Sequence, residues 1–427
     1  MKRFMVAAIL AVLVASVVFS YKFWTGEMIS KSKNDLVNSP KDVKKISFIH
    51  WEYFPLEIFN KFSEEHPDIK VEFQQLNENY YPLVQRTRIA SRSDISVMGV
   101  MESDYKDFVF KNYLSDLTGN KYLENYRPEV RERVRALTVG NREYAIAYKD
   151  SVYGVWYNKI LFKKYNLEVP KTYEEFLTVC ETLKKNGVQP LVMGARDELR
   201  GNSLFLLRFP ELVNKDKELL ERLKNKSIRW ADPEVSSLLK EIGSFADKGY
   251  ISKDSANLTY HQAFWEFSKG HAAMTIMGDW SINMASEDME KICEPGVFPI
   301  PYGTDGDIRI VPGSYAGMFL GIFPESAHKE EANLLLDFLS RLEIAQLFTN
   351  YTMWTPTIKN VDTSRLKYYE LWNPLRKLER FPPLTDVVSN DMQEMLGKGF
   401  RSLLIKEKTY EQLAQELQSV QDGNNGN

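Results

Sequence analysis

Apolar residues form two alternating patterns after about residue 45: short runs typical of buried strands, and longer stretches with helical spacing. Strand patterns cover Lys45–Trp51, Ile69–Gln74 and Asp94–Val100, and helical patterns cover Leu56–Glu65 and Tyr80–Ala90. The resulting order of strand, helix, strand, helix and strand predicts a parallel sheet with right-handed crossovers. The expected fold class is therefore α/β.

Aromatic and acidic residues follow these strands at the edge where open α/β sheets bind ligands. Trp51 comes directly after the first strand, and Glu102 and Asp104 come after the third. Tyr81 lies at the start of the helix that follows the second strand. All four are candidates for a ligand site, although Trp51 and Tyr81 also fit a packing role. Glu102 is an alternative to Asp104, because only loop geometry decides which carboxylate points inward.

A second candidate edge lies in Phe267–Trp280, which has the sequence FSKGHAAMTIMGDW. A helical pattern ends at Gly270, and the small apolar residues of His271–Met277 have the composition of a buried strand. Asp279 and Trp280 follow where that strand gives way to a helix. A carboxylate and a large aromatic ring are therefore expected at a strand end, in a position to contact a ligand.

Extended segments in the rest of the chain predict connections between two lobes. Tyr144–Tyr148 and Gly154–Tyr157 are separated by residues 149–153, which indicates a strand that leaves one sheet and enters another. A turn-rich loop at Tyr302–Asp307 and an extended segment at Tyr351–Ile358 are the other two predicted connections. Further strands are expected at Ile308–Pro312 and Gly317–Phe323. A helix is expected after the capping box formed by Thr172 and Glu175. Other helices are expected within Leu204–Ala246, over Glu325–Leu347 and within Asp386–Gln421.

Composition changes this picture mainly through the aromatic residues. They make up 13% of the chain, with 8 Trp and 22 Tyr, and their flat rings with polar edges suit sugars as well as core packing. A net charge of −3, with acids and bases interspersed, argues against a nucleic-acid partner. The 5 histidines lack metal-ligand spacing, so we assign no metal and expect no cofactor. Cys180 and Cys293 lie among apolar neighbours and fit buried free thiols at least as well as a disulfide.

The N-terminal segment has the features of a targeting signal. Met1–Arg3 is positively charged, and Phe4–Tyr21 is apolar and uncharged. A signal peptide or an N-terminal membrane anchor over residues 1–24 fits this pattern, followed by a polar linker over 25–44. The folded part is then expected outside the cytoplasm, either secreted or anchored to the outer face of the cytoplasmic membrane. Residues 422–427 are expected to form a disordered tail.

Five segments occur in the order of the motifs of one known family. Phe267–Trp280 is similar to F-x-x-G-x-A-A-M-x-x-x-G-x-W, and Pro170–Phe176 to P-x-T-W-E-E-F with Tyr173 in place of Trp. Gly154–Asn158 is similar to a signature of small, apolar, apolar, Tyr and Asn, with Trp156 as a departure. Later matches are Gly317–Phe323 and Trp354–Pro356. Together they resemble the extracellular solute-binding proteins of ABC importers, family 1, which include the maltose- and oligosaccharide-binding proteins.

The resemblance implies a two-lobed periplasmic-binding-protein fold, type II-like, with two open sheets flanked by helices and a ligand cleft between the lobes. Lobe 1 is expected to comprise residues 45–149 and 308–350, and lobe 2 residues 151–307 and 353–421. The implied function is that of a binding subunit, not an enzyme, which captures a sugar or oligosaccharide and delivers it to an ABC permease. We expect a monomer that meets the membrane only through its N-terminal segment.

The candidate ligand contacts come from both lobes and from the hinge between them. They are Asp279 and Trp280 on lobe 2, Trp51, Asp104, Glu102 and Tyr81 on lobe 1, and Tyr315 and Trp354 near the hinge. Aromatic faces stack on sugar C–H surfaces, and carboxylates accept hydrogen bonds from sugar hydroxyls. Three other functions stay open from the sequence: an exported glycosidase or lyase with paired carboxylates, a binding protein for a non-sugar solute, and a receptor subunit for a sensor kinase.

Overall fold

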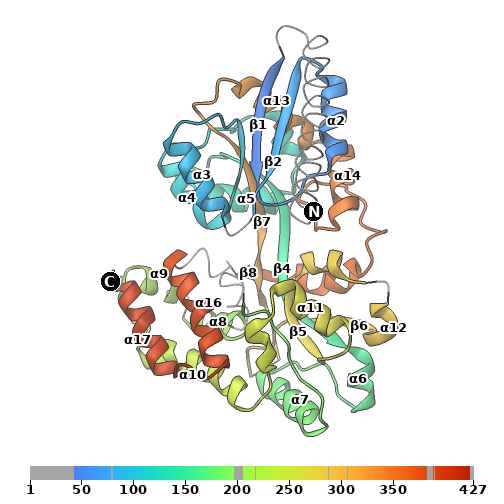
Figure 1. Cartoon of the computed structure of the whole chain (residues 1–427), viewed down its shortest axis with the longest axis vertical. Coiled ribbons are helices and arrows are strands. Elements are labelled where there is room, and N and C mark those ends of the chain that lie inside the picture. The colour runs from blue at the N-terminus through green and yellow to red at the C-terminus, as the bar shows by residue number, and fades with distance from the viewer. Residues whose placement is uncertain are drawn as a thin grey trace, which may run out of the picture.

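Two α/β lobes lie one above the other along the long axis of the molecule, and strands β4 (Ile146–Asn158) and β7 (Ile310–Ile322) run from one lobe into the other (Figure 1). This computed structural model describes residues 43–77, 80–196, 205–216, 218–286, 288–304, 306–381, 388 and 390–423. The predicted targeting segment at 1–24, residues 25–42 of the predicted linker and residues 424–427 of the predicted tail lie outside the described residues. Within the described ranges, no helix combines the length and apolar character that a membrane crossing requires.

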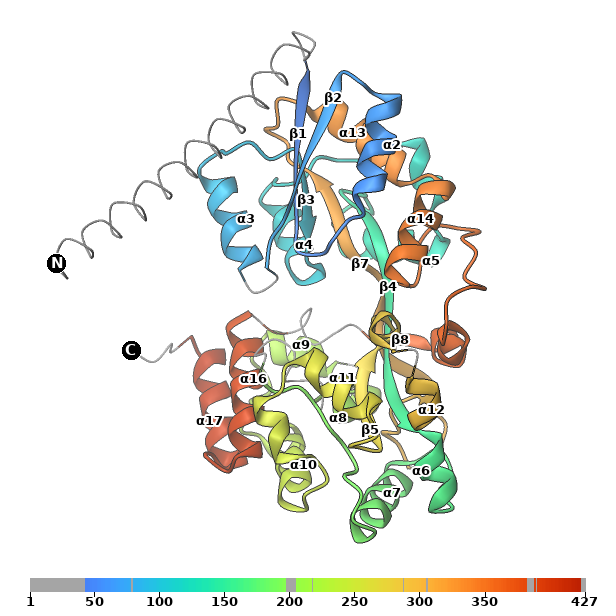
Figure 2. The same cartoon turned by 45° about the vertical axis from the view of Figure 1, so that its right-hand side comes forward.

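Lobe 1 is built on the predicted parallel strands. β1 (Lys44–His50) pairs in parallel with β2 (Ile69–Gln75) on one side and with β3 (Val97–Val100) on the other, which confirms the predicted parallel sheet. β7 adds antiparallel to β3, and β4 adds antiparallel to β7. The helices of this lobe are α2 (Leu56–Glu65), α3 (Tyr81–Ala90), α4 (Glu102–Phe110), α5 (Pro128–Ala136), α13 (Lys329–Leu339) and α14 (Leu342–Thr352). Figure 2 shows α3 and α4 on one side of the sheet and α2 and α14 on the other.

Lobe 2 has a smaller antiparallel sheet. The second half of β4 pairs with β5 (Met274–Gly278) and with β6 (Pro295–Phe298). α11 (Tyr260–Ser268) ends shortly before β5, so the predicted helix followed by a strand is confirmed. A 3-10 helix, η4 (Asp279–Met284), follows β5. The other helices are α6 (Lys159–Lys164), α7 (Tyr173–Lys185), α8 (Phe205–Lys215), α9 (Leu219–Lys224), α10 (Pro233–Asp247), α12 (Met289–Cys293), α15 (Asn373–Arg376), α16 (Asn390–Leu404) and α17 (Tyr410–Gln421).

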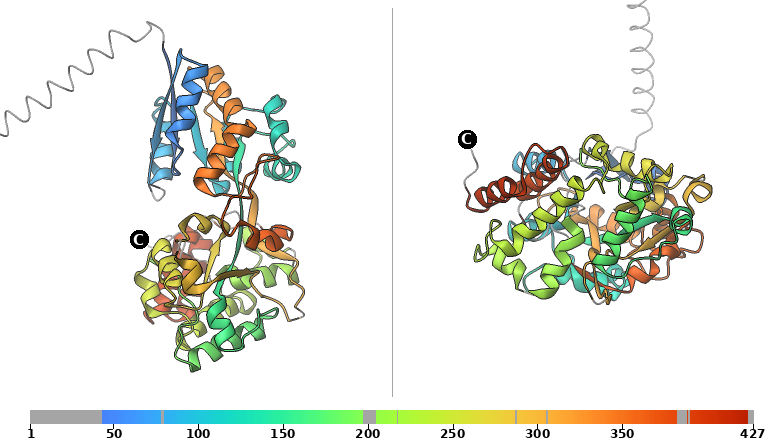
Figure 3. Two further views of the ribbon diagram at one scale, coloured as in Figure 1. Left: turned by 90° about the vertical axis from the view of Figure 1, so that its right-hand side faces the viewer. Right: turned by 90° about the horizontal axis from the view of Figure 1, so that it is seen from below.

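β4 changes partners as it passes between the lobes. Its residues Ile146–Lys149 pair with β7 in lobe 1, and from Tyr153 onward it pairs with β5 in lobe 2. The left view of Figure 3 shows the green strand of β4 passing from the upper lobe into the lower one. The pairing register with β7 shifts between Lys149 and Ser151. Such irregularities bend a strand and change the direction in which its side chains point. The side chains of β4 therefore need not alternate regularly between its two faces at this position.

β7 is one continuous strand where two separate strands were predicted. Its first residues pair with β8 (Glu379–Phe381), and Val311 packs with Trp156 and other core residues of lobe 2. Trp354 and Ile358 pack in the core of lobe 1. Val311 was expected in lobe 1, and Trp354 and Ile358 in lobe 2. The long strand explains the first difference, because its two halves belong to two cores.

The long helix predicted over Glu325–Leu347 is wrong, because two helices replace it. α13 ends at Leu339, and α14 begins at Leu342. The chain turns at buried Ser340, whose carbonyl accepts a hydrogen bond from Asn125 Nδ2 at 3.0 Å and whose hydroxyl lies 2.9 Å from the Tyr126 hydroxyl. The Ser340 carbonyl, which a continuous helix would direct along its own axis, is therefore bonded to the segment before α5 instead.

Two smaller predictions concern lobe 2. The capping box at Thr172 and Glu175 is confirmed at the start of α7, where each residue bonds the backbone N–H of the other. Cys180 and Cys293 are buried free thiols. Their separate positions in two apolar clusters of the lobe explain why they do not pair.

Candidate ligand-binding site

Two glycines make room for tryptophan rings at the strand ends that face the opposite lobe. A Cβ atom on Gly99 of β3 would lie 2.2 Å from Cδ2 of His50 and 2.8 Å from Cζ3 of Trp51. A Cβ atom on Gly278, the last residue of β5, would lie 2.0 Å from Cζ3 of Trp280. Each indole therefore lies directly over a strand backbone, which is a close approach that only glycine allows.

The aromatic wall of lobe 1 consists of Trp51 with His50 beneath it. The two rings stack with centroids 4.1 Å apart and planes 20° apart, and Tyr81 contacts Trp51 edge-on at 5.0 Å. His50 Nδ1 accepts a hydrogen bond from the Glu52 backbone N–H at 2.8 Å. Burial lowers the pKa of His50 to about 3, and the charge of Lys149 acts in the same direction. His50 is therefore neutral at physiological pH, with its hydrogen on Nε2.

Trp280 and Trp354 both contact the Lys149 ammonium group with their ring faces. Lys149 Nζ lies 4.1 Å from the ring centroid of Trp354 and 4.8 Å from that of Trp280. Tyr153 contacts Trp280 edge-on at 4.9 Å, and Phe348 contacts Trp354 at 5.6 Å. Since Trp280 follows β5 of lobe 2 and Trp354 packs on the core of lobe 1, Lys149 joins aromatic groups of both lobes at the strand between them.

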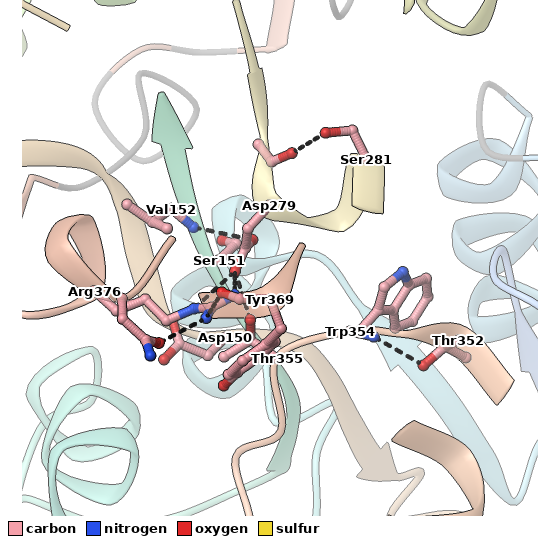
Figure 4. A network of polar contacts seen from close by, with 12 residues as sticks. Asp150, Ser151, Val152, Asp279, Ser281, Thr352, Trp354, Thr355, Tyr369 and Arg376 are labelled. Carbon is pink, nitrogen blue, oxygen red and sulfur yellow. Dashed lines mark hydrogen bonds and ion pairs between the residues drawn. The ribbon is translucent and has the colours of Figure 1, made fainter. Parts of the chain in front are cut away.

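A buried network of charges lies beside this aromatic group, around the bend of β4 (Figure 4). Asp150, at the bend, is 1% exposed and pairs with Arg127 of lobe 1 and with Arg380 of β8, the latter at 3.3 Å. The Asp150 backbone N–H donates to the carbonyl of Thr355 at 3.1 Å. Arg380 also donates to the Ser151 carbonyl at 2.9 Å. The network thus ties the crossing strand to segments of both lobes.

Asp279 belongs to the same network. One carboxylate oxygen accepts from the Val152 N–H at 3.3 Å, and the other accepts from the Thr355 hydroxyl at 2.5 Å. Arg376 pairs with that second oxygen at 3.2 Å, and its guanidinium group lies 3.6 Å from the ring centroid of Tyr369. The Asp279 carboxylate is only 2% exposed, so in this conformation it holds the joint between the lobes and presents no surface to a ligand.

The other polar candidates of lobe 1 are also engaged within the protein. Asp104 is buried and pairs with Arg86 at 3.0 Å, and Glu102 pairs with Arg133 at 2.8 Å. Tyr81 is fully buried, and its hydroxyl donates to the Gly99 carbonyl at 2.6 Å. Tyr315 lies on β7, and its side chain is outside the described part of the structure.

The structure therefore brings Trp51, Trp280 and Trp354 to the junction of the lobes and adds residues that the sequence did not single out. Lys149 and His50 complete the aromatic group, and Asp150 is the centre of the charge network. Lys149 could have been noticed as the first residue after the extended run Tyr144–Tyr148. The partners of Asp150 and Asp279 had no sequence signal, because they come from segments more than 20 residues apart. In the described part of the chain, no cluster of three or more His, Cys, Asp or Glu side chains could hold a metal ion.

The fold and this junction define a two-lobed binding protein whose lobes are joined by continuous strands. A family model described as bacterial extracellular solute-binding protein matches residues 52–345. The chain belongs to this family.

Known proteins with similar sequences and folds agree with this assignment. The chain is 24% identical over 298 residues to the multiple sugar-binding protein of Streptococcus mutans, covering 68% of this chain and 69% of that protein. It is 22% identical to an ABC transporter extracellular-binding protein of Pyrococcus horikoshii, covering 91% of this chain and 90% of that protein. A solved structure of a chitin oligosaccharide binding protein has a TM-score of 0.77 at 22% identity, covering 90% of this chain and all of that one.

Proposed function

We propose that this protein is the extracytoplasmic binding subunit of an ABC importer and captures a sugar or oligosaccharide between its lobes. The observation that carries the proposal is the position of three tryptophans: Trp280 and Trp354 both contact Lys149 at the junction of the lobes, and Trp51 lies at a strand end of lobe 1. Membership of the solute-binding family and the sugar-binding name of the Streptococcus mutans relative support it. Indole faces match the apolar faces of sugar rings.

The continuous strands β4 and β7 suit a hinge motion. A solute first contacts the rings of one lobe, and contacts with the other lobe form only on closure. Closure is therefore favoured when solute is present, because the closed state alone gains these contacts. The closed protein then delivers its solute to the permease without any covalent chemistry, so it needs no catalytic group. We place the protein outside the cytoplasm as a monomer, attached to or released from the membrane through residues 1–24.

The predicted site residues divide into two roles in this proposal. Trp51 and Trp280, which are half-buried, contact the solute directly, and Trp354, which is only 6% exposed, contacts Lys149 from the core of lobe 1. Asp279 holds the joint, and Tyr81 supports the wall formed by Trp51. Glu102 and Asp104 keep the first turn of α4 in place through their arginine partners.

Replacing Trp280 by Ala tests the proposal directly. In a thermal-shift screen of neutral and acidic mono- and oligosaccharides, a solute at about 100 times its Kd should stabilise the wild type by about 2.7 kcal/mol. Trp280→Ala should weaken binding of that solute by about 30-fold or more, since central aromatic contacts contribute about 2 kcal/mol. Trp265→Ala is the matched control, because Trp265 is 56% exposed on α11 and should leave binding unchanged.

Two results would overturn the proposal. The first is a screen in which no sugar stabilises the wild type. The second is chromatographic detection of shortened or modified sugars after incubation, which would make the protein an enzyme.

A further inference from the structure

We propose that Lys149 makes the site selective for solutes that carry a carboxylate, in particular oligosaccharides that contain a uronate residue. This inference rests on the proposed sugar-binding function and names the class of sugar. Three features of the junction carry it: the position of the ammonium group, the commitment of nearby carboxylates to arginines, and the hydrogen-bond donors around Lys149.

The ammonium group of Lys149 lies over the faces of two indoles at the junction of the lobes. Its Nζ atom is 4.1 Å from the centre of the Trp354 ring and 4.8 Å from the centre of the Trp280 ring. A sugar stacked on either indole would therefore have its substituents within reach of a positive charge. Lys149 is half-buried on β4, and its backbone carbonyl faces Gly317 on the neighbouring strand, so the root of the side chain is held by the sheet.

The carboxylates predicted to face a ligand are largely neutralised by arginines. Asp104 pairs with Arg86, and Glu102 with Arg133. Asp279 pairs with Arg376 and accepts two further hydrogen bonds. Among the described residues, Glu52 is a further acid at these strand ends, and it is half-buried after β1. A site for neutral sugars needs acceptors for hydroxyl hydrogens, and three of these four acids already serve other partners.

Hydrogen-bond donors collect around Lys149. The Nε1 atoms of Trp280 and Trp354 and the Nε2 atom of His50 are buried and have no hydrogen-bond partner. His50 Nδ1 is an acceptor, so Nε2 carries the hydrogen and is a donor. Lys149 contacts two of these rings, and its charge acts on the third. Buried N–H groups gain most from a strong acceptor, and a carboxylate is such an acceptor and is also attracted by the nearby ammonium group.

Matched pairs of acidic and neutral sugars test this inference by isothermal titration calorimetry. Digalacturonate is compared with galactobiose, and cellobiouronate with cellobiose. The wild type should bind the acidic member of at least one pair about 10- to 100-fold more tightly, as expected for charge-assisted hydrogen bonds. Lys149→Met should weaken binding of the acidic member about 10- to 100-fold more than binding of the neutral member, so that the preference is lost. The acidic preference should also weaken as salt is raised, in the wild type but not in Lys149→Met.

Two further variants separate recognition from folding. Lys149→Arg keeps the positive charge and should retain the acidic preference, even if Lys149→Met proves unstable. Lys164→Met is the control, because Lys164 makes a similar contact with Tyr165, at 5.1 Å, on the outer surface of lobe 2, and should leave all affinities unchanged.

The outcomes distinguish this inference from the proposed function. Preference for the neutral member of both pairs, or an equal loss of both members in Lys149→Met, overturns the role of Lys149 but leaves sugar binding intact. Tight binding of citrate or glutamate in place of either sugar overturns the uronate assignment. Failure of every sugar to bind overturns the proposed function itself.

Discussion

His50 shows how one buried residue shapes the aromatic wall of lobe 1. Its ring stacks on Trp51, lies close to the backbone of Gly99 and has little access to water. Taking an imidazolium ion out of water is unfavourable, so burial keeps the ring neutral. The aromatic wall formed by Trp51 and His50 is therefore uncharged. The positive charge near it comes from Lys149.

The low pKa of His50 predicts a loss of stability in acid. Below the ordinary value of about 6.5, the unfolded chain binds a proton at this residue, whereas the folded chain does so only below about 3. The free energy of unfolding should therefore fall as the pH decreases between these values. His50→Asn keeps an acceptor near the Nδ1 position and cannot titrate. Its stability deficit relative to wild type should shrink by about 2–3 kcal/mol from pH 7 to about pH 4.5, as measured by urea unfolding.

His261→Asn is the control for this effect, because His261 is exposed on α11. Parallel pH profiles for the wild type and His50→Asn would contradict the prediction.

At the level of elements, β5 and η4 together place Trp280. β5 is buried along its whole length and ends at Gly278, and the 3-10 helix that follows turns the indole back over this glycine. Tyr153, on the paired strand β4, contacts the same ring edge-on. The position of the indole is therefore fixed by a strand end, a tight helical turn and a neighbouring strand.

Gly278→Ala should displace the Trp280 ring. The added methyl group would lie 2.0–2.4 Å from three atoms of the indole, and the ring must move to relieve the overlap. We expect a loss of stability of about 1–3 kcal/mol and a clear loss of solute affinity, measured by thermal unfolding and calorimetry. Gly243→Ala is the matched control: nothing lies within 4 Å of a Cβ at this position in α10, so it should stabilise the protein by about 0.5–1 kcal/mol. Unchanged affinity in Gly278→Ala would show that Trp280 does not contact the solute.

At the level of the whole molecule, the two lobes are joined by continuous strands and by a buried charge network. Asp150 lies at the bend of β4, between Arg127 of lobe 1 and Arg380 of β8. Asp279 reaches the same region from the end of β5. Two features therefore form the joint between the lobes. The continuous strands β4 and β7 keep the lobes attached, and the charged hydrogen bonds of Asp150 and Asp279 fix the positions of the segments around the bend of β4.

Asp150→Asn should weaken this joint. The substitution retains the shape of the side chain but leaves the buried side chain of Arg380 and the half-buried side chain of Arg127 without this countercharge, which should lower the free energy of unfolding by about 3–5 kcal/mol in denaturant titrations. Asp107→Asn, which breaks an exposed pair with Lys111 in α4, should change it by less than about 1 kcal/mol. Equal effects of the two substitutions would show that the network does not stabilise the joint.

The sequence by itself was sufficient for the local elements and the family. The parallel strands of lobe 1, the α11–β5 unit and the capping box of α7 follow from apolar spacing and backbone bonding over a few residues, so they can be predicted locally. The split between α13 and α14 could not be predicted, because Ser340 bonds to Asn125 and Tyr126, more than 200 residues away in the chain.

For the candidate site, the sequence determined which residue types follow the strands, and the tertiary structure decided what they do. Trp51, Trp280 and Trp354 were expected near a ligand. Trp280 and Trp354 contact Lys149 between the lobes, Trp51 lies at a strand end of lobe 1, and contact with a solute stays a prediction. Asp279 has the same sequence signal as Trp280, yet it is buried in the joint, because Arg376 and Thr355 reach it from a distant segment. Lys149 has no motif of its own and contacts two indoles only after both lobes have folded. Periodicity reports which side of an element is buried, but the identity of a partner across the junction depends on long-range packing.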